Sequence, residues 1–307
     1  MKKVVVLGAT GRFGRAAVTA FSDAGWEVTG TARHWPMPDA QHVIVDPADA
    51  EALSAVARGQ DVIVNALNPP YPDWAKEVPR FTKAVIAATR SSGATVMIPG
   101  NVYNYGAAMP ERLHEDTAWN AHTRKGAIRV RMEHAYRDAG VRTIVLRGGD
   151  FLEAAQSGNW FDAQIAAKAW AGRVMYPGPR DVVHEWAWLP DMARAMVGLA
   201  EQRADFAPFE EFGFAGFALT GNDLVDLIER AVGRSCRVNG MPWPVVRMMA
   251  LVSPLMREVS EMRYLWRVPH AIDGSKLAQA LPDFIPTPAP EAIATALAAW
   301  KPPTGTE

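Results

Sequence analysis

The sequence predicts an α/β fold in which short parallel strands alternate with helices. In the first half of the chain, runs rich in β-branched residues are separated by alanine-rich segments, at residues 2–7, 27–32, 42–45, 61–67, 95–99 and 142–146. Such alternation is typical of βαβ units in a doubly wound parallel sheet. With 307 residues, the chain is long enough for one large domain of this kind and a smaller companion.

The first βαβ unit is the clearest of the series. A strand over residues 2–7 leads through a glycine-containing turn into a helix over residues 12–24, whose Ala17, Val18 and Phe21 share one face. Gly25 follows as a suitable helix stop. After Asp150 the pattern loosens, and helices are expected over 160–170, 190–202, 224–232 and 291–300, with prolines between them. We therefore predict a smaller, mainly helical C-terminal region.

The turn between the first strand and the first helix carries the strongest functional signal. It reads Gly8-Ala9-Thr10-Gly11-Arg12-Phe13-Gly14. Glycines permit the tight turn and let the backbone approach a pyrophosphate, while the helix N-terminus supplies free N–H groups and positive potential. The turn therefore predicts a Rossmann-type NAD(P)-binding domain with the cofactor contacts Gly8, Thr10, Gly11, Arg12, Phe13 and Gly14. We expect Gly11 to lie closest to the pyrophosphate, in a backbone conformation that a side chain would strain.

The end of the second strand predicts which dinucleotide is preferred. NAD-selective proteins place a carboxylate there for the ribose hydroxyls, whereas an arginine accommodates the 2′-phosphate of NADP. This chain reads Thr31-Ala32-Arg33-His34 and has no acidic residue at that point. Because a guanidinium forms a planar fork suited to phosphate, Arg33 favours NADP, with NAD as the alternative.

The amino-acid composition limits the classes of binding partner and the cellular compartment that we expect. Lysine and arginine together number 32 against 33 acidic residues, so no global charge favours nucleic acid or anionic lipid. A single cysteine, Cys236, excludes an intrachain disulfide and suits the cytoplasm. The apolar stretch over 245–256 is interrupted by Arg247 and Pro254, so no membrane span is expected. Its arginines and methionines favour an amphipathic helix with solvated guanidiniums.

Glycines at 8, 11 and 14 after a β-rich start resemble the extended and atypical short-chain dehydrogenase/reductases, the NAD-dependent epimerase/dehydratases. The resemblance runs nearly end to end. It implies that Asp46 lies on the adenine side of the cofactor and that Ala66, Leu67 and Asn68 form the nicotinamide-side loop. Residues 184–193 are similar to the segment that returns the chain to the cofactor domain. Within that segment we expect Asp191 to cap a helix N-terminus.

The resemblance also implies domain limits. Residues 1–150, with 181–200 returning to them, would form the NAD(P)-binding domain, and residues 151–180 and 201–307 the substrate-binding region. Tryptophans crowd the part that borders the substrate cleft, at Trp160, Trp170, Trp186 and Trp188. Most should be core, and they slightly favour an apolar or ring-bearing substrate.

The family's catalytic pattern is incomplete in this chain. Its members use a Tyr-x-x-x-Lys pair with an upstream Ser or Thr, and the phenol passes a proton as hydride moves. Here Lys125 matches the lysine, which implies contact with the nicotinamide ribose, but Ala121 stands at the tyrosine position. Asn101 occupies the usual hydroxyl position. We predict Tyr103 as the substitute proton donor, with Tyr105 as the alternative and His122 and Thr123 as weaker candidates.

Two functions of different classes follow. The first is an NAD(P)-dependent oxidoreductase or epimerase/dehydratase-type enzyme that acts by hydride transfer on a carbonyl, alcohol or sugar-like small molecule. The second is an NADP(H)-binding redox sensor, similar to the NmrA-like regulators, that has lost catalysis. No metal site is expected, since no His-Glu-x-x-His or Cys/His cluster is present. A homodimer through the helices over 73–91 and 125–139 is a further hypothesis.

Overall fold

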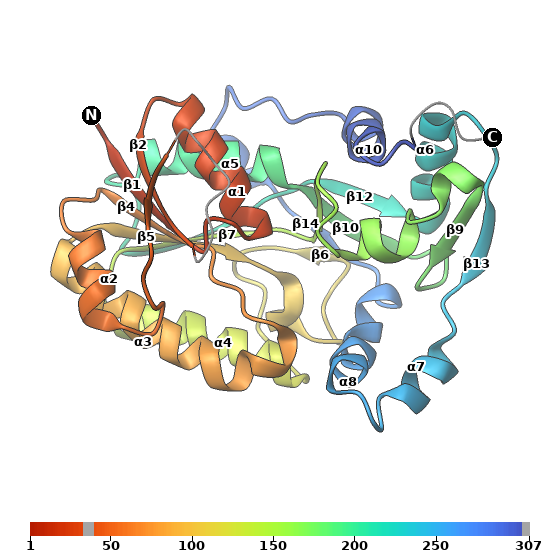
Figure 1. The fold of residues 1–307 in the computed structure, drawn as a ribbon, viewed down its shortest axis with the longest axis horizontal. Helices are drawn as coiled ribbons and strands as arrows, with labels where there is room; N and C mark the ends of the chain where they lie inside the picture. Colours follow the sequence, from red (N-terminus) through yellow and green to blue (C-terminus); the bar gives the residue numbers. More distant parts are fainter. Residues whose placement is uncertain (33–39, 303–307) are drawn as a thin grey trace.

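A computed structural model describes residues 1–32 and 40–302. Seven parallel strands form the large sheet, in the order β11-β7-β5-β4-β1-β2-β3 (Figure 1). Their bounds are β1 Lys3–Leu7, β2 Glu27–Thr31, β3 Gln41–Val43, β4 Val62–Asn65, β5 Thr95–Gly100, β7 Thr143–Arg147 and β11 Phe209–Gly213. The reversal of strand order at β1 and β4 is the doubly wound arrangement predicted from the sequence.

Helices cover both faces of this sheet (Figure 1). On one side lie α1 (Arg12–Asp23) and α5 (Leu189–Glu201), and on the other α2 (Ala50–Ala57), α3 (Trp74–Ser92) and α4 (Arg124–Asp138). The strands are buried on both sides: Val4 and Val6 belong to the core under α1 and α5, and Val5 to the core under α3 and α4. Sheets with helices on both faces require such nearly continuous apolar strands.

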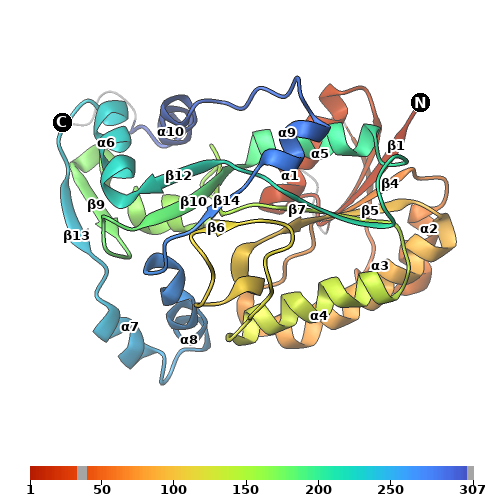
Figure 2. The ribbon, with the colours of Figure 1, turned by 180° about the vertical axis from the view of Figure 1, so that it is seen from behind.

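The C-terminal region is mixed rather than mainly helical (Figure 2). A three-stranded sheet is formed by β12 (Phe217–Thr220), β10 (Val183–Trp188) and β8 (Asp150–Leu152). Two further strand pairs are β9 (Arg173–Tyr176) with β13 (Arg237–Gly240) and β6 (Arg112–Leu113) with β14 (Ala271–Ile272). The helices are α6 (Gly221–Val232), α7 (Trp243–Met249), α8 (Pro254–Glu261), α9 (Ser275–Ala280) and α10 (Ala289–Ala298). Trp186, Trp188 and Trp266 lie in the core of this region.

Three local predictions differ from the structure. The expected helix over 160–170 is a π-helical turn at Phe161–Ile165 and a 3-10 turn at Ala169–Ala171, which ends at Gly172 in the left-handed conformation. Asp191 does not cap α5, since Trp188 holds that position. Its carboxylate instead accepts hydrogen bonds from the Thr287 backbone and from Arg194, at 2.5 and 2.7 Å, and so ties the chain before α10 to α5. Residues 209–213, assigned from sequence to the substrate-binding region, form the edge strand β11 of the large sheet.

A buried ionic network joins the large sheet to α4. Arg147, at the end of β7, donates to Glu133 of α4 at 2.7 Å and to Glu211 of β11 at 2.6 Å. A third hydrogen bond, of 2.6 Å, runs from its guanidinium to the Asn101 carbonyl. Arg147 is only 1% exposed, so each of these bonds offsets the loss of hydration of a charge.

Replacing Arg147 by methionine should therefore destabilise the protein severely. Arg147→Met keeps the length of the side chain but leaves Glu133 and Glu211 buried without a cation, which costs about 3–5 kcal/mol. Urea denaturation measures the loss of unfolding free energy. Arg203→Met is the matched control, because Arg203 pairs with Asp61 at a partly exposed position and should cost below about 1 kcal/mol. Equal losses in the two variants would contradict the assignment.

Candidate cofactor and substrate site

The turn between β1 and α1 presents an open helix N-terminus. Gly11 caps α1 without any side-chain hydrogen bond, and the first turn holds no acidic residue. The first-turn N–H groups of α1 have no partner inside a helix, so they are available to an anion. Gly11 is exposed, so the turn is open to a ligand at this point. Its φ is −69°, which any residue adopts, so the expectation of backbone strain at Gly11 is wrong.

The other two glycines of the turn are structural. Gly8 has φ +73°, in the left-handed region that favours glycine, and a Cβ there would lie 3.0 Å from the Ala66 carbonyl oxygen. A Cβ at Gly14 would overlap the carbonyl oxygen of Gly8. Gly8 therefore allows the turn to lie against the end of β4, and Gly14 allows α1 to lie close to β1.

The loop after β4, expected on the nicotinamide side of the cofactor, lies beside this turn. Ala66 follows β4 and its N–H donates to Leu7 of β1 at 3.0 Å, while the Leu67 N–H bonds to the Asn65 side chain at 3.3 Å. Asn68 is exposed at the same edge. Asp46 is exposed after β3, where its carboxylate accepts from the Ala48 N–H at 2.9 Å. Arg33 lies outside the described residues.

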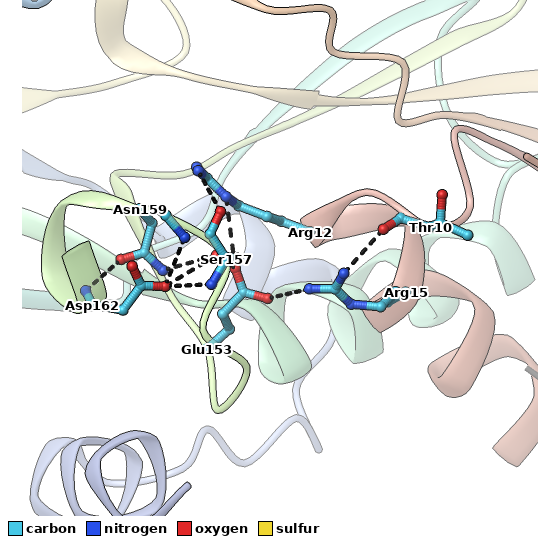
Figure 3. Close-up of polar contacts among 8 residues, drawn as sticks. Thr10, Arg12, Arg15, Glu153, Ser157, Asn159 and Asp162 are labelled. Carbon is cyan, nitrogen blue, oxygen red and sulfur yellow. Dashed lines mark hydrogen bonds and ion pairs between the residues drawn. The ribbon is translucent and has the colours of Figure 1, made fainter. Parts of the chain in front are cut away.

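A strap from residue 153 to residue 162 covers the start of α1 (Figure 3). Arg12 donates to the Ser157 carbonyl at 3.2 Å and lies 3.9 Å from the Glu153 carboxylate. Arg15 bridges Glu153, at 3.2 Å, and the Thr10 carbonyl, at 3.0 Å. Arg12 is thus held by the strap, and its contact with a phosphate would compete with the Glu153 carboxylate.

Tyr103 lies at the carboxyl end of β5 and is hydrogen-bonded to a second phenol. The 3-10 turn Val102–Tyr105 begins at Asn101, whose side-chain oxygen accepts from the Tyr103 N–H at 3.0 Å. The hydroxyl of Tyr103 lies 3.1 Å from that of Tyr71, a residue that the sequence analysis missed. Burial first, and then the neighbouring Tyr71 and Asp150, raise the pKa of Tyr103 well above its usual value. Tyr103 therefore stays a neutral phenol at physiological pH.

Tyr105, the alternative donor, points elsewhere. Its hydroxyl donates to Glu211 at 3.3 Å and its ring lies 5.4 Å from the Arg147 guanidinium. The Tyr105 side chain therefore belongs to the buried ionic network around Arg147, whereas the Tyr103 hydroxyl pairs with Tyr71.

Lys125 is buried in ion pairs with α8. Its ammonium contacts Glu258 and lies 2.7 Å from Glu261, and it also lies over the Tyr71 ring at 5.0 Å.

The two weaker candidates for the proton donor, Thr123 and His122, make contacts that stabilise the local structure. Thr123 caps α4 by accepting from the Gly126 N–H at 3.0 Å, and the His122 ring nitrogen accepts from the Ala107 N–H at 3.1 Å.

An aspartate and a histidine are paired in the small sheet of the C-terminal region. The carboxylate of Asp150, the first residue of β8, accepts a hydrogen bond from the ring of His184 of β10 at 2.9 Å, and the His184 ring stacks on Trp266 at 4.2 Å. The charge of Asp150 contributes, after burial, to the raised pKa values of Tyr71 and Tyr103. The sequence does place both residues shortly after strands of the large sheet, since Asp150 follows β7 and Tyr71 lies in the connection after β4. That position is the signal by which sequence reasoning could have found them.

These contacts define a dinucleotide-binding α/β protein with polar groups gathered at one edge of its parallel sheet. The open N–H groups and the exposed Gly11 fit a pyrophosphate, and the Ala66 loop lies beside them. Within the described residues, no group of three or more His, Cys, Asp or Glu is placed to hold a metal ion. Among the same residues, no helix is both long and apolar enough to cross a bilayer.

A family of NAD(P)H-binding proteins matches residues 8–164, just over half of the chain. The chain belongs to this family. The structural neighbours of this chain are sugar-nucleotide epimerases of the extended short-chain dehydrogenase/reductase type. No curated protein sequence matches significantly.

Two solved structures illustrate the likeness. A presumed epimerase from Burkholderia cenocepacia has a TM-score of 0.79 at 21% identity, with 97% of each chain covered. The UDP-glucose 4-epimerase from Brucella ovis in complex with NAD has a TM-score of 0.75 at 17% identity, with 96% of each chain covered. At these identities the likeness shows the fold.

The glycine turn makes a sharp test of where the cofactor binds. Gly11→Val should keep the apo fold, because φ is ordinary and the Gly8 oxygen, 3.1 Å from the new Cβ, needs to shift by only a few tenths of an ångström. It should weaken NADPH binding by about tenfold or more, since the side chain covers the phosphate approach. Gly14→Ala should instead lower the melting temperature of the apo protein. Thr19→Val, on an exposed position of the same helix, is the control. Wild-type NADPH affinity in Gly11→Val would place the phosphate elsewhere.

Proposed function

We propose that this protein is an NADP-preferring oxidoreductase or epimerase/dehydratase-type enzyme that acts on a carbonyl, alcohol or sugar-like small molecule. The observation that carries the proposal is the Tyr103–Tyr71 hydroxyl pair, 3.1 Å apart, at the sheet edge where the glycine turn and the Ala66 loop also lie. Ligands bind at this carboxyl edge of doubly wound sheets. Residues 1–150 with 181–200 would bind the cofactor, and residues 151–180 and 201–307 the substrate.

Bound NAD(P) would exchange a hydride with the substrate carbon. Tyr103 would donate a proton to the oxygen of a carbonyl as negative charge develops on it, and the Tyr71 hydroxyl would hydrogen-bond to the phenolate that remains. The raised pKa of Tyr103 keeps the proton on the phenol, which is the protonation state that carbonyl reduction requires. Asn101 holds the backbone of Tyr103 in place through its side-chain oxygen.

Asp150 and His184 would orient the substrate. The Asp150 carboxylate can accept a hydrogen bond from a substrate hydroxyl, and its charge, which also acts on Tyr71 and Tyr103, disfavours an anionic group at that point. Trp266, stacked on His184, adds an apolar surface beside it. Together these features support a neutral, hydroxyl-bearing or ring-bearing substrate over a strongly anionic one.

Lys125 would reach the nicotinamide ribose only after leaving Glu258 and Glu261. Those ion pairs are the observation that favours the second candidate function, an NADP(H)-binding redox sensor without catalysis. A sensor would bind NADPH tightly, turn over no aldehyde, ketone or sugar nucleotide, and bind a partner protein with different affinities in its NADP and NADPH forms.

We also propose a homodimer that forms through α3 and α4, which lie side by side on one face of the sheet (Figure 2).

The Tyr103 hydroxyl is testable by removing one oxygen. Once a screen of aldehydes and ketones identifies a substrate, Tyr103→Phe should lower kcat by roughly 10²–10⁴ while NADPH affinity stays unchanged. In the wild type, the reduction rate should not fall from about pH 6 to pH 9, because a phenol with a raised pKa remains protonated below that pKa. Tyr105→Phe is the control and should keep kcat. A wild-type kcat in Tyr103→Phe would remove Tyr103 from the mechanism.

Cofactor preference is tested at Arg33. NADPH should bind at least about ten times more tightly than NADH, because the guanidinium can pair with the 2′-phosphate. Fluorescence titration of Arg33→Ala should show a weakened affinity for NADPH and an unchanged affinity for NADH. Arg58→Ala, at an exposed position after α2, serves as the charge-matched control. Equal affinities of the wild type for the two cofactors would contradict the preference.

A further inference from the structure

The hairpin formed by α7 and α8 carries most of the exposed apolar side chains. Of the nine large apolar residues that are exposed among the described residues, six lie between positions 245 and 255: Val245, Met248, Met249, Leu251, Val252 and Leu255. The hairpin stands at one end of the molecule, away from the large sheet (Figures 1 and 2). Leu251 and Val252, in the connection between the helices, are 80% and 86% exposed. They project outward rather than line a groove.

Arginines surround these apolar side chains. Arg247, Arg257 and Arg267 are exposed, and Arg263 lies over the Trp243 ring at 5.4 Å. Partial burial, and then the positive charges of Arg267 and Arg247, lower the pKa of Arg263, so these three guanidiniums lie near one another. In the described part of the chain, none of the four forms an ion pair with a carboxylate.

The acidic residues of α8 face the other way. Glu258 is buried against Lys125 of the cofactor domain, and Glu261 accepts from Lys125 and from the Arg124 N–H at 2.7 and 2.5 Å. Because both carboxylates are turned inward, the outer surface of the hairpin is apolar and cationic. The near-zero charge of the whole chain hides this local asymmetry.

We propose that the α7–α8 hairpin docks the protein onto the surface of an anionic lipid bilayer. Helices that lie in the membrane interface combine an apolar face with cationic side chains, which contact acyl chains and anionic headgroups respectively. Both helices are far too short to span a bilayer, so the docking is interfacial. The solvated amphipathic helix expected from sequence is in fact two short helices with their apolar residues at the tip.

Self-association through the same surface is disfavoured by charge. In a two-fold dimer the same patch meets itself, which would bring the arginines of one copy toward those of the other without a carboxylate between them. An anionic bilayer supplies the complementary charge that a second copy lacks. A test of the docking does not require turnover, since none of the residues proposed for catalysis lies in the tip of the hairpin.

Vesicle sedimentation tests the docking. The full chain is mixed with vesicles of phosphatidylcholine alone or of phosphatidylcholine with about 30% phosphatidylglycerol, at low and high salt. We expect binding to the anionic vesicles, weakened about tenfold or more on the neutral vesicles and by high salt. The double variant Leu251→Glu, Val252→Glu should lose binding, and Arg247→Gln with Arg257→Gln should weaken it.

Ile285→Glu is the matched control. Ile285 is 78% exposed in the connection between α9 and α10, across the molecule from the hairpin (Figures 1 and 2), and this variant should bind like the wild type. Melting temperatures confirm that each variant is folded. Absence of wild-type binding, or equal binding by Leu251→Glu, Val252→Glu, would overturn the proposal. Light scattering that shows a dimer lost in that variant, without vesicle binding, would assign the hairpin to self-association instead.

Discussion

The ion pairs of Arg147 with Glu133 and Glu211 are the constraint on which the site depends. Arg147 ends β7, Glu133 belongs to α4 and Glu211 to β11, so two consecutive elements and a third from 64 positions later meet at one buried guanidinium. The same guanidinium binds the Asn101 carbonyl. Asn101 in turn caps the turn that carries Tyr103. The position of the Tyr103 hydroxyl is therefore set by a charge that is fully paired inside the protein, where alternative arrangements would leave a carboxylate unpaired.

The parts of the fold that were predictable from sequence are those fixed by local chemistry. The strand, glycine turn and helix over residues 3–23 follow from a run of valines, three glycines and an amphipathic segment, and each signal spans only a few residues. Even there, the backbone strain expected at Gly11 was wrong. Gly8 needs its positive φ and Gly14 needs close packing, whereas Gly11 has an ordinary backbone. A pattern of glycines indicates that another part of the backbone lies close to them. It does not identify the segment that approaches each glycine.

The site beyond the cofactor turn was less predictable because it is built from long-range contacts. Tyr71 and Tyr103 are 32 positions apart and lie on different βα connections, and Asp150 meets His184 only because β8 pairs with β10. No local pattern encodes such pairs. Likewise, the lysine that matches the family motif is recognisable at position 125, but its partners Glu258 and Glu261 follow more than 130 positions later. Motif matching identified the residue and could not identify its electrostatic surroundings.

The two faces of α8 belong to different surfaces of the protein. Its inner face directs Glu258 toward Lys125, close to the phenol of Tyr71, and its outer face carries Leu255 and Arg257 into the surroundings. Any displacement of α8 must therefore change both surfaces at once. If Lys125 lost its carboxylate partners, it would be free for the ribose contact proposed above, and the buried Glu258 would need water or another cation. A surface that holds α8 in one position would thus bias the electrostatics of Lys125, and contacts at the hairpin would be coupled to the proposed chemistry at the sheet edge through one short helix.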